Sequence, residues 1–165
     1  MDKDKLATLI TGAQENLRKD GELVPVVFLE QEHETIGVAF HMPPGDRHWF
    51  FTSMGKIFAA KYPDLKSVTL LADAYTKMWD TEKYSSEEVL EEATKRRLVD
   101  DPESVECINA IQVNADGTSI DAVCIYTRNV ELKSTTFEFE EIKFHEQETT
   151  PQPNLLVSFW EGYRS

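Results

Sequence analysis

Apolar residues recur at intervals of three and four along three segments, which is the pattern of helices with one buried face. Asp46 stands where it can cap the second of them, and Ser85 with Glu88 forms a capping box at the third. The sequence therefore predicts helices over residues 3–18, 49–61 and 86–98.

Short runs rich in β-branched and aromatic residues, bounded by turn formers, predict strands. Residues 67–78 carry apolar side chains at both parities, which favours a central strand covered on both faces. Pro25 lies near the start of the predicted strand 23–30. It indicates either that this strand is at an edge of the sheet or that the proline is at the first residue of the strand. The predicted strands are residues 23–30, 36–42, 67–78, 105–113, 120–130, 135–145 and 155–160.

The pair Asp116–Gly117 predicts a tight hairpin between the two longest strands of the final third. We prefer a two-residue type I′ turn with Ala115 opposite Thr118, because this register gathers the apolar residues on one face. In that register the two cysteines lie diagonally on the same face. A three-residue loop is the alternative, and it would set Ile111 against Asp121.

The next predicted strand changes parity part-way. Phe137 and Phe139 share one parity, whereas Ile142 and Phe144 share the other. One extra residue at Glu140–Glu141 would return all four side chains to one face, which is what a β-bulge does.

The element order α-β-β-α-β-α-β-β-β-β indicates an α+β fold. We expect a mostly antiparallel sheet with about three helices packed mainly on one face. No linker or repeat divides the chain, so residues 1–165 are expected to form a single domain.

Three short motifs occur in order along the chain: residues 20–28 (DGELVPVVF), residues 70–75 (LLADAY) and residues 101–102 (DP). With them the sequence resembles a loose group of small uncharacterised bacterial and phage α+β proteins, which have a D-G-x-x-x-P-x-x-F start and a later acidic-Ala-aromatic strand. Asp73 and Tyr75 stand where Glu and Trp are commoner in that group. The resemblance implies a single domain, and it brings no known activity.

The composition and the net charge exclude several classes of protein. Hydrophobic residues make up 41% of the 165, which is enough for a core and too many for intrinsic disorder. Thirty acidic against 17 basic residues give a net charge of −13, which argues against binding to nucleic-acid backbones or anionic membranes.

The same sequence indicates a compartment. It shows neither a signal peptide nor an apolar run long enough to cross a membrane. Cys107 and Cys124 are far apart and form no CxxC motif, so we expect packed free thiols in a reducing environment. We therefore predict a cytoplasmic protein.

The familiar catalytic motifs are missing. The sequence contains no phosphate-binding loop, no GxGxxG, no GxSxG and no HExxH. No cofactor or metal is therefore predicted from motifs.

One loop gathers groups that could do chemistry. His41, Asp46 and His48 could supply metal ligands or an acid and base, with Arg47 beside them for an anion. The plainer interpretation, which we favour, is that Asp46 is a helix cap and the two imidazoles make ordinary hydrogen bonds.

Asp73 is the second candidate, because a carboxylate within an apolar strand must be paired or protonated if it is buried. The alternative is a residue at the rim of the sheet or a structural partner of a basic side chain.

These observations leave two hypotheses. We prefer an acidic accessory module that binds another protein, a basic one for preference, in the manner of an immunity or antidote factor or a nucleic-acid mimic. Its acidic segments would be residues 80–106 and 131–148. The alternative is a small hydrolase or metal-binding protein that uses a cleft formed by His41, Asp46, His48 and Asp73. The oligomeric state is left open.

Overall fold

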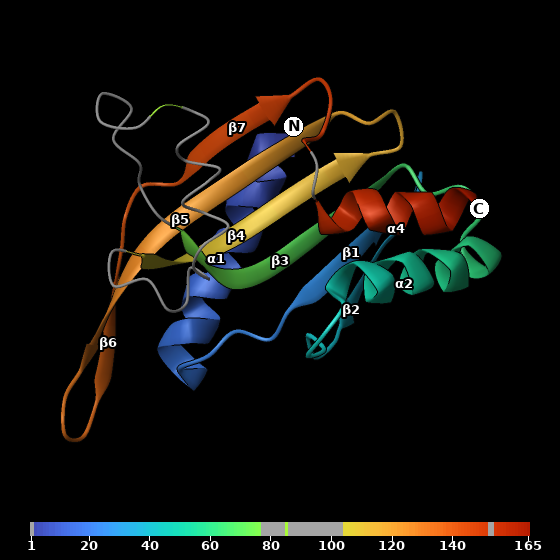
Figure 1. Ribbon diagram of the computed structural model, residues 1–165. Helices are drawn as coiled ribbons and strands as arrows, with labels where there is room; N and C mark the ends of the chain where they lie inside the picture. Colours follow the sequence, from blue (N-terminus) through green and yellow to red (C-terminus); the bar gives the residue numbers. More distant parts are fainter. Residues whose placement is uncertain (1, 77–84, 86–103, 152–153) are drawn as a thin grey trace.

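The computed structural model describes the chain apart from residues 1, 77–84, 86–103 and 152–153 (Figure 1). In the described part, three helices pack on one antiparallel sheet of seven strands, as the predicted α+β class requires. The helix predicted over 86–98 lies outside the described residues. The strands are β1 (Val26–Glu30), β2 (Thr35–Ala39), β3 (Ser67–Thr76), β4 (Val105–Asn114), β5 (Ser119–Val130), β6 (Thr135–Phe139) and β7 (Lys143–Gln147). The helices are α1 (Asp2–Asp20), α2 (Arg47–Lys61) and α4 (Leu155–Arg164).

The strand order in the sheet is β2-β1-β3-β4-β5-β6, and β7 also pairs with β5. The predicted central strand is confirmed, because β3 is paired along one side with β1 and along the other with β4. Pro25 directly precedes β1, which itself lies between β2 and β3, so the position at the strand start is the correct alternative.

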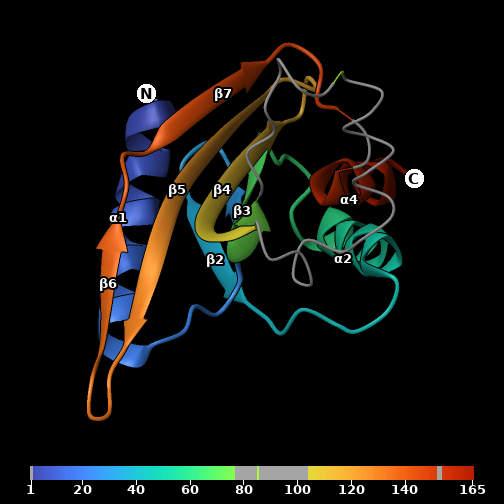
Figure 2. The same cartoon turned by 60° about the vertical axis from the view of Figure 1, so that its left-hand side comes forward.

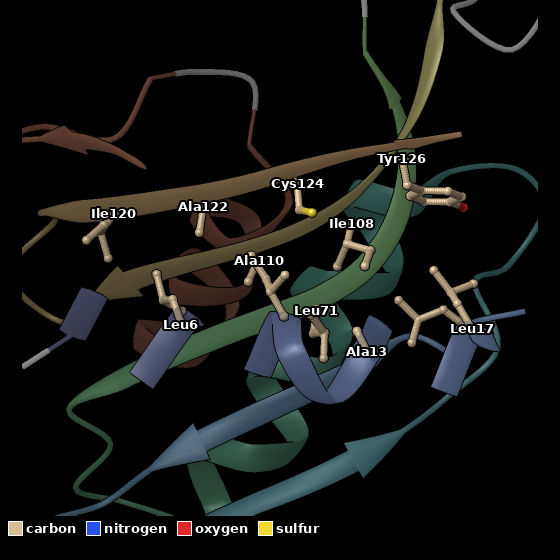
Figure 3. Packing of buried hydrophobic residues seen from close by; sticks show 12 residues of the cluster. Leu6, Ala13, Leu17, Leu71, Ile108, Ala110, Ile120, Ala122, Cys124 and Tyr126 are labelled. Carbon is tan, nitrogen blue, oxygen red and sulfur yellow. The ribbon is translucent and has the colours of Figure 1, made fainter. Parts of the chain in front are cut away.

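The two faces of the sheet carry separate cores. Leu71 of β3 faces α1 and packs with its apolar stripe, whereas the neighbouring Leu70 faces α2 and α4. Figure 3 shows Leu6 and Ala13 of α1 directed toward the strands. Figures 1 and 2 show α2 and α4 side by side on the other face. Two of the three described helices thus share one face.

Helices α2 and α4 approach so closely that their backbones touch. A Cβ atom added to Gly55 would lie 2.0 Å from the carbonyl oxygen of Phe159, and one added to Gly162 would lie 1.9 Å from that of Thr52. Trp160 then fixes the pair to the sheet, since its indole Nε1 donates to the carbonyl of Val113 at 3.1 Å.

The prediction of a strand over residues 155–160 is wrong, because this segment begins α4. The side chain of Asn154 accepts from the backbone N–H of Leu156 at 2.8 Å and so caps the helix. Leu156, Phe159 and Tyr163 recur at helical spacing toward the core around α2. A short run of large apolar residues that follows prolines is typical of a strand. Here the packing against α2 favours the helix instead.

The preferred register of the β4–β5 hairpin is also wrong. Ile111 lies opposite Asp121, as the three-residue loop requires. The N–H of Gly117 bonds to the carbonyl of Asn114 at 2.9 Å, and Gly117 has φ +91°, which favours glycine. The side chain of Asp116 stabilises this loop by accepting from the Thr118 amide at 3.0 Å.

The predicted bulge in the following strand is confirmed. Tyr126 pairs with Phe139 and Val123 with Lys143, so two residues of β5 face the three residues 140–142. This extra residue separates β6 from β7 and turns all four apolar side chains toward one core. Phe137, Phe139, Ile142 and Phe144 pack against the cluster beneath α1.

Candidate functional site

Asp46 and His48 of the predicted loop site take structural roles. Asp46 caps α2, accepting the backbone N–H of Trp49 at 3.0 Å, as the plainer interpretation held. His48 Nδ1 lies 2.7 Å from the hydroxyl of Ser158, which ties α2 to α4. His41 is exposed in the segment after β2.

Asp73 lies on the other side of the sheet. It follows Leu71 on β3 at the same parity and is opposite Ile108, and both of these apolar residues face α1. Partial desolvation raises the pKa of Asp73, and the nearby carboxylate of Glu106 raises it further. Because α2 packs on the opposite face, the structure does not bring His48 and Asp73 together. In the described ranges no three metal-ligating side chains meet.

Arg128, which the sequence analysis did not single out, joins three elements. Its Nη1 donates to the carbonyl of Gly21 at 2.9 Å, directly after α1. Its guanidinium also bonds to Glu106 of β4 at 3.4 Å and lies over the Phe137 ring of β6, 5.2 Å from the centroid. These contacts fix the place where the β5–β6 hairpin leaves the body of the molecule.

Beyond Arg128 the β5–β6 hairpin projects past the rest of the described chain (Figures 1 and 2). A bond of 2.8 Å from the Glu131 amide to the Ser134 carbonyl closes its turn. Two apolar side chains stand at this tip: Val130 is 72% exposed and Leu132 is fully exposed. We call Val130 and Leu132 the hairpin tip.

The chain around this hairpin is strongly acidic. Residues 131–148 contain six acidic against two basic side chains, and all six carboxylates are exposed. The other predicted acidic segment, residues 80–106, lies mostly outside the described residues. The acidic band, as we call residues 131–148, includes β6 and β7, which both pair with β5 at one edge of the sheet.

A cavity of about 380 Å³, lined by both polar and apolar side chains, opens on the α4 side of the sheet. Its lining includes Asp121 of β5 and His145 of β7, which are paired across the two strands. The amide of Asn109 donates to Asp121 Oδ1 and, at 3.2 Å, to the carbonyl of Ala122. Burial raises the pKa of Asp121, while the Asn109 bond and the charge of His145 act in the opposite direction.

The sequence analysis missed this cavity, although a signal was present. The sequence pattern places the three-residue hairpin loop second because Ile111 would then face Asp121, and that pairing forms part of the cavity wall. A carboxylate opposite an apolar residue on an inner sheet face is itself a mark of a specialised position.

The correct register also separates the two cysteines. Cys107 pairs with Ile125, and Cys124 pairs with Ile108, so the thiols point to opposite faces of the sheet. Both thiols are free and buried. Burial and the charge of Asp121 raise the pKa of Cys107 to about 11, so this thiol stays protonated and is a poor nucleophile at neutral pH.

No protein-family model, no curated protein and no solved structure matches this chain. None of the described helices has the length and apolar character needed to cross a membrane.

Proposed function

We propose that the protein is an accessory module that binds a basic protein partner through its β5–β6 hairpin. The observation that carries this proposal is the hairpin tip, where Val130 and Leu132 project into solvent. Scattered apolar residues are common on protein surfaces, but two that stand together at the end of a projecting element form a compact apolar anchor.

The anchoring of the hairpin supports the same function. Because Arg128 bonds to both Gly21 and Glu106, the root of the hairpin is held by α1 and β4. An element that is already ordered loses less conformational entropy on binding than a free loop does. The hairpin can therefore hold its tip in a fixed position for a partner at a low entropic cost.

Charge indicates the chemistry of the partner. The acidic band begins in the hairpin, at its turn and β6, and continues through β7 along the same edge of the sheet. The whole chain carries a net charge of −13. Such a surface speeds encounter with a basic protein and makes the association rate fall as salt rises. The partner should therefore offer an apolar pocket with basic residues at its rim.

The test compares two exposed apolar sites. The double variant Val130→Ser/Leu132→Ser removes the tip, and Ile57→Ser, at a residue of α2 that is 66% exposed, is the matched control. Each protein is immobilised and incubated with native lysate at low and at high salt, and the retained proteins are quantified by mass spectrometry. We expect a basic protein that wild type and Ile57→Ser retain, that the tip variant loses and that high salt weakens.

Two results would contradict the proposal. One is that the tip variant retains the same proteins as wild type in the same amounts. The other is that neither salt condition yields a specific partner for the wild-type chain.

A further inference from the structure

We propose that the cavity beside Asp121 binds a small organic cation that carries a primary ammonium group. The cavity is formed by strands β4, β5 and β7 and by Pro151 and Asn154. The cavity is separate from the hairpin tip, because Asp121 and Val130 lie nine residues apart on one strand. At about 3.3 Å per residue the two are roughly 30 Å apart.

The acceptor for the cation is a carboxylate held in place by its neighbours. Asn109 donates to Oδ1 of Asp121 and to the backbone of Ala122, which fixes the side chain against β4. The other oxygen, Oδ2, receives no hydrogen bond from the residues that the structure describes. One ammonium group could donate to it without displacing Asn109.

The electrostatics favour a positive ligand. A half-buried carboxylate with a neutral amide as its donor is poorly compensated, and the raised pKa of Asp121 reflects this. His145 faces it across the β5–β7 ladder but is itself exposed to solvent. The net charge of −13 raises the local concentration of cations and lowers that of anions.

The rest of the lining sets the size and shape of the ligand. A volume of about 380 Å³ is at the small end of the range for ligand pockets. Ile111 and Pro151 supply apolar surface for a short carbon chain. Ser119, Gln147 and Asn154 add oxygen atoms that can accept further N–H groups. A metal ion fits less well, since the described residues bring no three metal-ligating side chains together.

The experiment uses the full chain and putrescine as the probe. Calorimetry measures its affinity for wild type, for Asp121→Asn and for Glu138→Gln, which removes an exposed carboxylate of β6 outside the cavity. Butyrate and 1-butanol test an anion and a neutral molecule of similar length. We expect one putrescine per chain, a loss of about tenfold or more in Asp121→Asn, and a change of less than about twofold in Glu138→Gln.

Wild-type NMR spectra give a readout that does not depend on any variant. Putrescine should shift the signals of Asp121, His145 and Ser119 and leave those of the hairpin tip in place. Several weak sites, equal losses in both variants, or shifts spread over the exposed glutamates of the acidic band would mean that putrescine is only a counterion, and the proposal would be overturned. Equal binding of butyrate or 1-butanol, or no binding by wild type, would overturn it as well.

Discussion

At the scale of single residues, the pKa values of three carboxylates on the sheet, Asp73, Asp121 and Glu30, are shifted in different directions. Asp73 and Asp121 are partly desolvated on the sheet, and the pKa of each is raised. Burial would also raise the pKa of Glu30, but hydrogen bonds from Lys5 and Ser67 outweigh it and lower the pKa. Asp73 and Asp121 therefore oppose folding when they are ionised, whereas Glu30 stabilises the fold when it is ionised.

Asp73→Asn should therefore stabilise the protein at neutral pH. The folded-state pKa of Asp73 lies above the value of 3.8 expected when unfolded, so the cost of ionising it appears as pH rises through 3.8. The cost is complete above the folded-state pKa. Urea denaturation of wild type and variant should show a gain at pH 7 that disappears near pH 3.

Glu30→Gln is the matched control, and it has the opposite sign. The stability that Glu30 contributes is present above its unfolded value of 4.5 and is lost as pH falls through the lowered folded-state pKa. A loss of stability for Asp73→Asn at pH 7 would show that Asp73 is a structural partner of Arg128. A gain that does not depend on pH would show that the ionisation of Asp73 is not its cause.

At the scale of elements, the backbones of α2 and α4 lie in close contact. Each helix places a glycine against the other's backbone, and this approach brings His48 to Ser158 and Trp160 to the sheet. No larger residue fits either position without separating the helices.

Gly162→Ala should destabilise the protein by about 3 kcal/mol, since the Cβ of the new alanine would collide with the backbone carbonyl of Thr52. Gly12→Ala on α1 is the control: a Cβ there meets nothing within 4 Å, so the change should stabilise by roughly 0.5–1 kcal/mol through helix propensity. Both values come from chemical denaturation. Equal effects of the two substitutions would rule out the close helix contact.

The elements also show how much the sequence could predict. Apolar residues spaced three and four apart located α1 and α2, and apolar residues at both parities located β3. Both worked because a buried face requires apolar side chains at the spacing of its helix or strand. The parity change at Glu140 even located the bulge. The prediction failed from residue 155 onward because a ten-residue apolar helix and a buried strand have similar composition.

The candidate site was harder to predict than the fold. Asp46 was correctly seen as a cap, but the grouping of Asp73 with His48 required knowing which face each would occupy. The Asp121 cavity depended on a hairpin register that differs from its rival by a single residue. The tip residues Val130 and Leu132 look like ordinary strand and turn positions until their exposure is known.

At the scale of the whole molecule, charge and shape act together. The sheet carries helices on both faces, while the β5–β6 hairpin and the acidic band occupy one edge of it (Figure 2). An apolar tip next to dense negative charge combines a short-range anchor with long-range attraction. This combination is the basis of the proposed role in binding a basic protein.

The most direct test of this role is photo-crosslinking from the tip. A photoreactive phenylalanine analogue is placed at Leu132 in one protein and at Ile57 in another, and each is irradiated in native lysate at low salt. The account predicts one dominant adduct with a basic protein from position 132, weakened by high salt and absent from position 57. No adduct at position 132, or the same adducts at both positions, would contradict it.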